Sequence, residues 1–163
     1  MIEILDADLS NPRHAEAMVR LLNEYALDEM GGRCELPAFA KANLAAELGK
    51  RAGAYVILAF EQGQPVGLAI CFEGFSTFAC KPLLNIHDIM VTSSHRGRGI
   101  AKQLLSKAED IALALGCCKL TLEVLEGNRI AQAAYRACGY AAYQLSPQAG
   151  SALFWQKKLE PSG

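Results

Sequence analysis

The chain has 163 residues, of which 52% are hydrophobic and 20% are charged, and its formal net charge is −1. This length allows one compact domain, and this composition is typical of a folded globular protein rather than a disordered one. A nucleic-acid binder would carry a basic excess, which the chain lacks. We therefore expect a single domain over residues 1–163 that does not bind nucleic acid.

The N-terminal segment and the cysteines indicate the cellular compartment of the protein. Residues 1–6 lack the basic and then apolar stretches of a signal peptide. No apolar run approaches the ~20 residues that a membrane span requires. The six cysteines show no paired C-x-x-C metal spacing, so we interpret them as reduced core thiols. The sequence predicts a cytoplasmic protein with no membrane partner and no metal.

The hydrophobic pattern predicts elements in the order β-α-α-β-β-β-α-β-α-β-β. The first strand covers residues 2–5, and Ser10 or Asn11 can cap the first helix, with Pro12 in its first turn. Hairpins combined with β-α-β crossovers indicate an α/β protein with a mixed sheet. The later helices are expected at residues 37–48, 99–115 and 128–138, and the later strands at 54–60, 66–72, 84–91, 119–125, 140–144 and 152–157.

The segment His-Arg-Gly-Arg-Gly-Ile-Ala, residues 95–101, lies between a predicted strand and a predicted helix. The first amides of a helix lack internal partners and carry about half a positive charge, and glycines let the backbone approach an anion. Arg96, Arg98 and Lys102 add positive charge. The segment therefore suits a phosphate or pyrophosphate, although glycines at such a turn can also serve geometry alone. It is neither a P-loop nor a dinucleotide fingerprint, because Ile100-Ala101 and Lys102 stand where those motifs need other residues.

Two motifs resemble those of the GNAT acetyltransferase superfamily. Its acetyl-CoA signature is Arg or Gln, two residues, Gly, one residue, then Gly or Ala, and residues 96–101 fit it at every specified position. A second signature, Asn and later Tyr, then Gly with an aromatic, matches Asn128, Tyr135 and Gly139-Tyr140. The element order fits as well. The resemblance implies a GNAT-like acyl-CoA N-acyltransferase fold, with a central mixed sheet and helices on both faces, and an N-acetyltransferase that takes acetyl-CoA as its cosubstrate.

The same resemblance implies how acetyl-CoA is held. The pyrophosphate would contact the loop of Arg96 and Gly97 and the amides of Arg98, Gly99, Ile100 and Ala101. The pantetheine arm would bond like an added strand to the backbone of Ile89, Met90 and Val91, where the family splays two strands apart. Asn128 precedes Tyr135 by two helical turns, about 10 Å on one face, so both can contact this ligand.

Two residues are candidates for proton transfer. Tyr135 is the candidate general acid at the departing thiolate, because a tyrosine hydroxyl with an ordinary pKa of ~10 can donate a proton. The alternative is that Tyr135 is a packed aromatic and Asn128 merely a helix cap. His87 is the candidate base, since an imidazole with an ordinary pKa of ~6.5 can accept a proton at pH 7. The alternatives are a structural histidine, with Glu123 or water as the base.

Asp88 is the candidate binding residue for a cationic amine. A regular strand would point His87 and Asp88 to opposite faces, so a bulge is needed to bring both to one site. The alternative is that Asp88 pairs with a nearby Lys or Arg. Weaker candidates for the acceptor site are Asp28, Glu29 and Glu73.

The chain looks most like the diamine and thialysine acetyltransferase branch of the superfamily, on Phe75-Ser76-Thr77-Phe78, residues 86–91 and Leu153-Phe154-Trp155. That branch usually has Glu-Asp in place of His87-Asp88, so the resemblance does not fix a polyamine acceptor. We expect a small-molecule primary amine, such as a polyamine, a lysine analogue or an amino-acid-like compound. The alternatives are a protein or peptide acceptor, or an acetyl-CoA-binding module without catalysis. A homodimer is suggested by relatives alone.

Overall fold

The computed structural model describes residues 1–160, and its elements follow the predicted order. The strands are β1 (Ile2–Asp6), β2 (Ala54–Glu61), β3 (Gln64–Ser76), β4 (Lys81–Val91), β5 (Leu120–Leu122), β6 (Gln144–Ser146) and β7 (Gly150–Ser151). The helices are α1 (Pro12–Leu27), α2 (Ala38–Gly49), α3 (Ile100–Ala114) and α4 (Arg129–Ala137), with short 3-10 turns η1 (Glu29–Gly31) and η2 (Ser93–His95).

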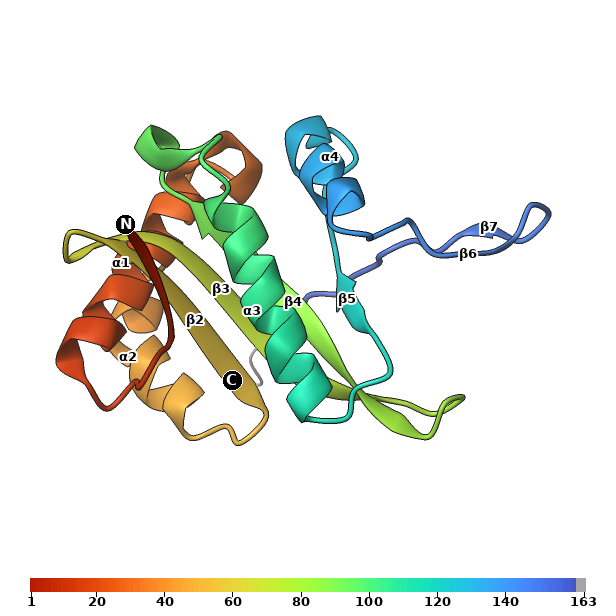
Figure 1. Ribbon diagram of the computed structural model, residues 1–163, viewed down its shortest axis with the longest axis horizontal. Helices are drawn as coiled ribbons and strands as arrows, with labels where there is room; N and C mark the ends of the chain where they lie inside the picture. The colour runs from red at the N-terminus through yellow and green to blue at the C-terminus, as the bar shows by residue number, and fades with distance from the viewer. Residues whose placement is uncertain (161–163) are drawn as a thin grey trace.

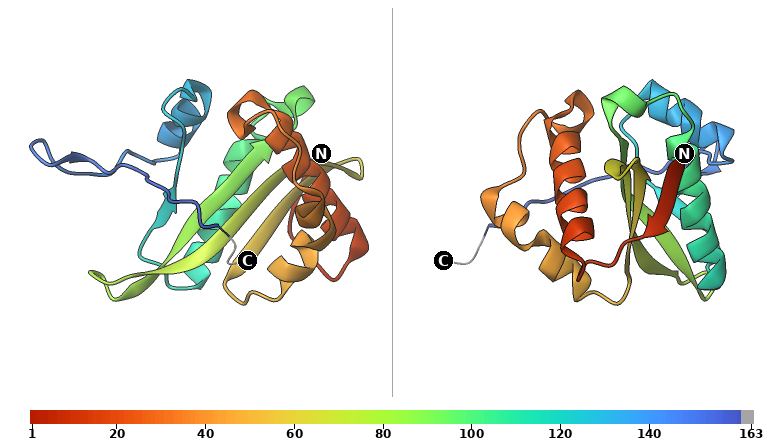
Figure 2. Two further views of the ribbon diagram at one scale, coloured as in Figure 1. Left: turned by 180° about the vertical axis from the view of Figure 1, so that it is seen from behind. Right: turned by 60° about the vertical axis from the view of Figure 1, so that its left-hand side comes forward.

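Strands β1 to β5 form one mixed sheet in sequence order. The first four pair antiparallel, and β5 pairs parallel with β4. Parallel neighbours need a crossover connection, which α3 supplies. Helices α1 and α2 cover one face of the sheet and α3 covers the other (Figures 1 and 2). The expected α/β fold with helices on both faces is confirmed.

The core has two layers, one on each face of the sheet. Alternation along β2 sends Val56, Leu58 and Phe60 toward α1 and α2, and Ile57 and Ala59 toward α3. The stripe predicted for α3 is the side that it buries: Ile100, Leu104, Leu105, Ala108 and Ala112. This packing fixes the start of α3 against the sheet, and the glycine-containing loop precedes that start.

Helix ends lie where the local sequence predicts them. Asn11, rather than Ser10, caps α1 by accepting a hydrogen bond from the Arg13 amide at 3.0 Å. Gly139 has a φ of 91° and ends α4, where its amide donates to the Arg136 carbonyl at 3.0 Å.

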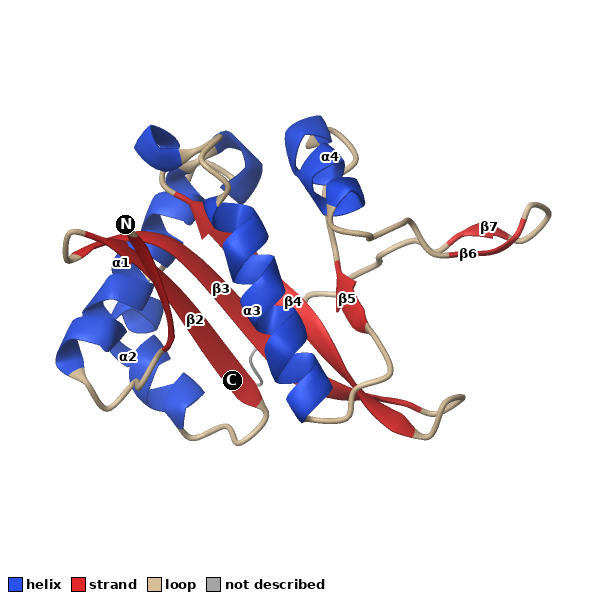
Figure 3. Ribbon diagram, viewed as in Figure 1, coloured by secondary structure: helices blue, strands red, loops and turns tan. Residues whose placement is uncertain are grey.

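The C-terminal strands are where the sequence prediction is wrong. β6 and β7 pair only with each other (Figure 3). They lie at 144–146 and 150–151 instead of 140–144 and 152–157, and residues 152–160 form no strand. β5 is also shorter than the predicted 119–125. An apolar pattern favours a strand, but a strand forms only where it finds an edge to pair with, and this one has found none.

The cysteines differ from the prediction as well. All six are free thiols, but only Cys71 is buried, while Cys34, Cys80 and Cys118 are exposed. The expectation of core thiols is therefore wrong for these three. Within residues 1–160, no helix is both long enough and apolar enough to cross a bilayer.

Candidate active site

The loop between β4 and α3 has the geometry of an anion site. Gly97 and Gly99 have φ of 75° and 77°, a region that L side chains rarely adopt. A Cβ on either would meet nothing within 4 Å beyond its chain neighbours, so both face open space. Gln103 donates its amide to the Gly99 carbonyl at 3.2 Å, which leaves the preceding amides of α3 without a helical partner. The site predicted at Gly99, Ile100 and Ala101 can therefore accept an anion.

Ion pairs fasten this loop to two distant elements. Arg98 donates from Nη1 and Nη2 to the two carboxylate oxygens of Glu61 at 2.9 and 2.6 Å. His95 Nε2 lies 3.0 Å from Oε2 of the same carboxylate. Hydrogen bonds from Arg98 hold the pKa of Glu61 at about 2, below its usual 4.5. Arg96 donates to Asp28 at 2.8 Å and to the Val91 carbonyl at 3.2 Å.

These ion pairs change the interpretation of the two arginines. Arg96 and Arg98 were expected to add positive charge for the anion, but each neutralises a carboxylate of the fold. The unpaired amides at the start of α3 therefore remain as a source of positive potential at the loop. Asp28, a weaker acceptor candidate, serves the loop through Arg96, and Glu29 pairs with Arg33 at the surface at 3.1 Å.

The edge of β4 opens beyond Ile86. β5 pairs with β4 only where Leu84, Asn85 and Ile86 face Leu120, Thr121 and Leu122. The side chain of Asn85 closes this paired region by donating to Thr121 Oγ1 at 3.0 Å and to the Glu123 carboxylate at 3.3 Å. From residue 87 to Val91, the paired neighbour of β4 is β3 alone. This open edge includes Ile89, Met90 and Val91, where the sequence predicts it.

A bulge in β4 lies at His87. Cys71 of β3 faces Ile86 and the preceding Ile70 faces Asp88, so His87 is the extra residue. Ile86 and Ile89 both pack on the α3 side. In a regular strand, residues three apart would point to opposite faces, so the bulge shifts the alternation by one residue. His87 and Asp88 therefore both face α1, as a shared site requires.

The contacts of His87 agree with this orientation. Its ring packs edge-on against Phe72 with 5.3 Å between ring centroids, and Phe72 belongs to the core layer under α1. The rest of the His87 side chain is exposed.

Asp88 is half-buried beside α1. Burial raises the pKa of its carboxyl, and the nearby charge of His87 partly offsets this. Within residues 1–160 no Lys or Arg forms a salt bridge with Asp88, so the alternative role of an internal ion pair is not seen. The Asp88 charge adds to burial in raising the pKa of Tyr25.

Tyr135 lies on α4 and approaches the same region. Burial, with a smaller contribution from Tyr25, raises the pKa of Tyr135 to about 12. Its ring lies 6.1 Å from that of Tyr140 and packs against the core layer under α3. Asn128 accepts a hydrogen bond from the Ala131 amide at 3.2 Å. It therefore caps α4, which is the alternative role that the sequence suggested for it.

Tyr25 interacts electrostatically with both sides of the site, since the Asp88 charge contributes to raising the pKa of Tyr25 and Tyr25 contributes to raising the pKa of Tyr135. Tyr25 is not marked as functional by the sequence, because a tyrosine at a helical spacing is typical of an apolar core position. The local sign of a functional role is a hydroxyl on the last turn of a helix that otherwise buries apolar side chains. Glu61 was also missed, and no local signal marks it.

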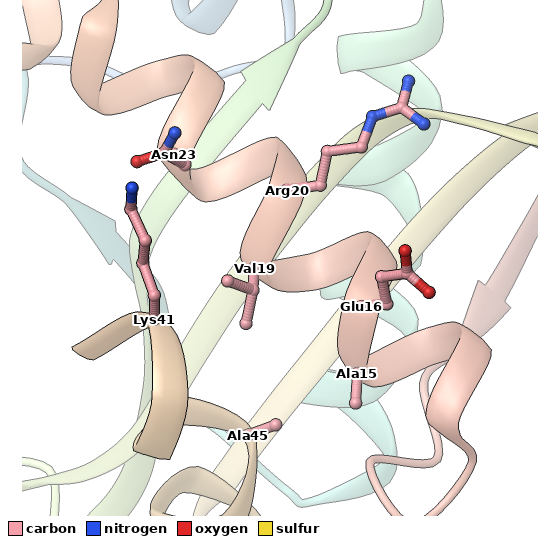
Figure 4. Close-up of a pocket in the computed structure, with 7 residues that line it drawn as sticks. All are labelled: Ala15, Glu16, Val19, Arg20, Asn23, Lys41 and Ala45. Atoms are coloured by element: carbon pink, nitrogen blue, oxygen red, sulfur yellow. The ribbon is translucent and has the colours of Figure 1, made fainter. Parts of the chain in front are cut away.

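A separate groove of about 410 Å³ lies between α1 and α2 (Figure 4). Lys41 and Asn23 lie together at one end of it, and Val19 and Ala45 form part of its wall (Figure 4). Its lining comes only from these two helices and includes none of the residues discussed above. It is therefore not part of the site.

A helix start whose first amides lack helical partners, next to a strand edge open for an extended ligand, is the arrangement of an acyl-CoA-binding transferase. Comparison with known proteins identifies the family. Residues 15–140 match the acetyltransferase (GNAT) family, and the chain belongs to it. The protein is an N-acetyltransferase that depends on acetyl-CoA.

Individual relatives agree with this assignment. The chain is 30% identical over 132 residues to the uncharacterized N-acetyltransferase YhfO of Bacillus subtilis (strain 168), covering 77% of this chain and 83% of that one. It is 34% identical over 74 residues to thialysine N-epsilon-acetyltransferase of Bos taurus, which is 45% of this chain and 43% of that protein's length. Aminoglycoside N-acetyltransferase AAC(6')-Iy in complex with CoA has the same fold, with a TM-score of 0.76, 20% identity and coverage of 98% and 96%.

Proposed function

We propose that the protein transfers the acetyl group of acetyl-CoA to a primary amine of a small cationic molecule, such as a polyamine, a lysine analogue or an amino-acid-like compound. The observation that carries this proposal is Asp88, a half-buried carboxylate beside the open edge of β4 that forms no salt bridge with any Lys or Arg of residues 1–160. A buried charge without a partner is costly in a folded protein. An ammonium group on the acceptor would supply the missing partner.

The residues present fit acetyl-CoA. The amides of Arg98, Gly99, Ile100 and Ala101 would hold its pyrophosphate, and the open edge at residues 89–91 would hold its pantetheine arm. Open space at Gly97 and Gly99 leaves room for the phosphates. When bound, acetyl-CoA supplies a thioester for the amine to attack and a thiolate that leaves.

We assign the binding of the amine and the two proton transfers to three side chains. Asp88 attracts the cationic acceptor, and His87, on the same face, accepts the proton that the ammonium must lose before its nitrogen can attack. Tyr135 keeps its proton at Oη, because a pKa of about 12 leaves the hydroxyl protonated at any physiological pH. It can therefore donate that proton to a departing thiolate. Glu123, the reserve base, lies 3.3 Å from the Asn85 amide at the end of the paired region.

The names of the relatives support a small-molecule acceptor, since thialysine and aminoglycosides are both amines of low mass. A protein or peptide acceptor and a binding module without catalysis remain the alternatives to be tested. We place the enzyme in the cytoplasm, where six free thiols stay reduced.

The decisive experiment measures thiol release from acetyl-CoA with a panel of acceptors: polyamines, lysine analogues, amino acids, aminoglycosides and peptides. We expect release with at least one cationic small amine, and a rise in its KM on Asp88→Asn. Release with peptides alone would replace the proposed acceptor class. Tight CoA binding without release for any amine would favour the binding module.

A further inference from the structure

Arg96 lies where three parts of the site meet. It belongs to the loop between β4 and α3, and its Nε donates to the carbonyl of Val91, at the open edge of β4, at 3.2 Å. Its Nη2 donates to the carboxylate of Asp28, at the end of α1, at 2.8 Å. The loop and the end of α1 lie side by side at the same end of the sheet (Figures 1 and 2). Arg96 therefore joins the parts that we assign to acetyl-CoA to the helix that borders the acceptor.

Asp28 organises the end of α1 through its own backbone and one carboxylate oxygen. Its amide donates to the Tyr25 carbonyl at 3.1 Å, and its carbonyl accepts from the Gly31 amide at 3.0 Å. Its Oδ1 accepts from the Met30 amide at 3.2 Å and caps η1. Gly31 packs so closely on the helix end that a Cβ there would collide with the Tyr25 carbonyl oxygen. The other oxygen, Oδ2, is the one that bonds Arg96.

Residues 25–36, which we call the α1 turn, form one hydrogen-bonded unit with the helix. The Cys34 amide donates to the Ala26 carbonyl at 3.2 Å. The Leu36 amide donates to the side-chain oxygen of Asn23 at 2.9 Å. Within residues 1–160, one ion pair joins this unit to the loop before α3, and it is the pair that Asp28 forms. A change at the loop can therefore reach the whole α1 turn through this pair.

The α1 turn borders the region where we place the acceptor. Its first residue, Tyr25, is half-buried. Burial, and after it the charges of Asp88 and Asp28, raise the pKa of Tyr25. Tyr25 in turn contributes to the raised pKa of Tyr135. The Tyr25 side chain is therefore within electrostatic reach of both the candidate amine-binding carboxylate and the candidate acid, and the order of the α1 turn affects the acceptor side of the site.

We propose that Asp28 is a positioning residue that, through Arg96, couples the binding of acetyl-CoA to the order of the α1 turn and so to the binding of the amine. An arginine side chain has five N–H donors, and Arg96 gives one to Val91 and one to Asp28. The remaining donors are available to a phosphate oxygen, so both bonds can persist when acetyl-CoA binds. A guanidinium held by a phosphate holds Asp28 more firmly, and by reciprocity each substrate binds more tightly when the other is present. This inference rests on the proposed acetyl-CoA site.

Asp28→Asn separates the ion pair from the local structure of the turn. An asparagine keeps a side-chain oxygen that can accept from the Met30 amide, so the cap of η1 is retained while the charge opposite Arg96 is lost. Glu35→Gln is the matched control. It also removes one carboxylate from the α1 turn, but the partner of that carboxylate is Lys41 of α2, at 2.7 Å. The two variants therefore differ in whether the lost ion pair leads to the loop.

Amide hydrogen exchange with CoA as the probe measures the coupling without an acceptor. In the parent protein and in Glu35→Gln, saturating CoA should slow exchange several-fold both in the loop, residues 97–103, and in the α1 turn. In Asp28→Asn, CoA should still slow exchange in the loop but leave the α1 turn unchanged. Protection of the loop alone in the parent, or equal protection of the α1 turn in Asp28→Asn, would overturn the coupling. An unprotected loop in the parent would overturn the acetyl-CoA site as well.

Calorimetry extends the test to the amine. The Kd for CoA is measured with and without a saturating concentration of the amine that gives the fastest thiol release, and no turnover occurs because CoA carries no acetyl group. In the parent protein and in Glu35→Gln, the amine should lower this Kd roughly fivefold or more, which is the lower end of ordinary coupling between sites. In Asp28→Asn, the amine should leave the Kd nearly unchanged. No tightening in the parent, or the same tightening in Asp28→Asn, would show that the pair does not couple the two substrates.

Discussion

Arg98 and Glu61 form a two-point ion pair, with 2.9 Å from Nη1 to Oε2 and 2.6 Å from Nη2 to Oε1. The pair joins the loop before α3 to the end of β2, 37 residues earlier in the chain. A planar guanidinium that meets a carboxylate at both oxygens fixes orientation as well as distance. We therefore infer that Glu61 positions the amides at the start of α3 through Arg98.

Replacing Glu61 should make the loop before α3 less rigid without changing the groups that transfer protons. We expect Glu61→Gln to raise the KM for acetyl-CoA by roughly three- to tenfold, the range of one charge-assisted hydrogen-bond pair, with kcat nearly unchanged. Initial-rate kinetics at a saturating amine concentration measure this. Glu3→Gln, an exposed change on the neighbouring strand β1, is the control and should leave both constants alone. An equal loss in kcat would mean that Glu61 acts on more than the loop.

The same carboxylate predicts a specific acid sensitivity. Its pKa in the folded protein is about 2, below the usual 4.5, so the stability it contributes is present above pH 4.5. That contribution is lost as the pH falls from 4.5 toward 2. Urea titrations across this range should show a shallower loss of unfolding free energy in Glu61→Gln than in the parent protein. Parallel slopes would contradict the assigned pKa.

The parts of the fold that depend on local chemistry were predictable from the sequence. Asn11 and Gly139 set helix ends through their own backbone preferences, and the stripe on α3 follows from helical spacing. A shared site for His87 and Asp88 requires the bulge at His87, but the presence of this bulge depends on how β3 pairs with β4. Glu61 joins the loop through tertiary structure alone. A strand at residues 152–157 requires pairing with an edge elsewhere in the fold, and no local pattern shows whether that pairing forms.

Gly99 tests whether the loop binds the anion through its backbone. Gly99→Ala places a Cβ in the open space above the helix start and forces an L side chain to a φ of 77°. We expect CoA affinity to fall at least tenfold and stability by about 1 kcal/mol or more. Calorimetric titration with CoA and thermal unfolding measure the two effects.

Gly116 provides a matched control for this change. It has a φ of 73°, also faces open space, and lies beyond the opposite end of α3. Gly116→Ala should therefore lose comparable stability and keep its affinity for CoA. If both variants lost CoA binding equally, the loss would reflect strain and not the anion site.

Tyr135 is expected to act in catalysis rather than in binding. Tyr135→Phe should lower kcat by about a hundredfold or more, since general acids contribute about 10²–10⁴-fold, while the Kd for CoA changes little. Because burial raises its pKa to about 12, the hydroxyl stays protonated, and no alkaline limb below pH 10 should come from it. Tyr140→Phe, which alters the neighbouring ring, is the control. An unchanged kcat would remove Tyr135 as the acid.

Substitutions of Asp88 and of His87 should affect different steps, amine binding and proton transfer respectively. Asp88→Asn should raise the KM for a cationic amine at least tenfold and leave the KM for acetyl-CoA alone. Burial raises the pKa of Asp88, so in the parent protein amine affinity should fall at a higher pH than for an exposed carboxylate as the solution is acidified. Steady-state kinetics from pH 5 to 9 with both substrates varied measure this.

His87→Ala should instead flatten the acid limb of the kcat profile, because an imidazole accepts a proton only in its neutral form. His87→Gln is the control for the loss of packing against Phe72 and should behave like alanine if the role is proton transfer. An acid limb that is unaltered in both variants would assign the base to Glu123 or to water.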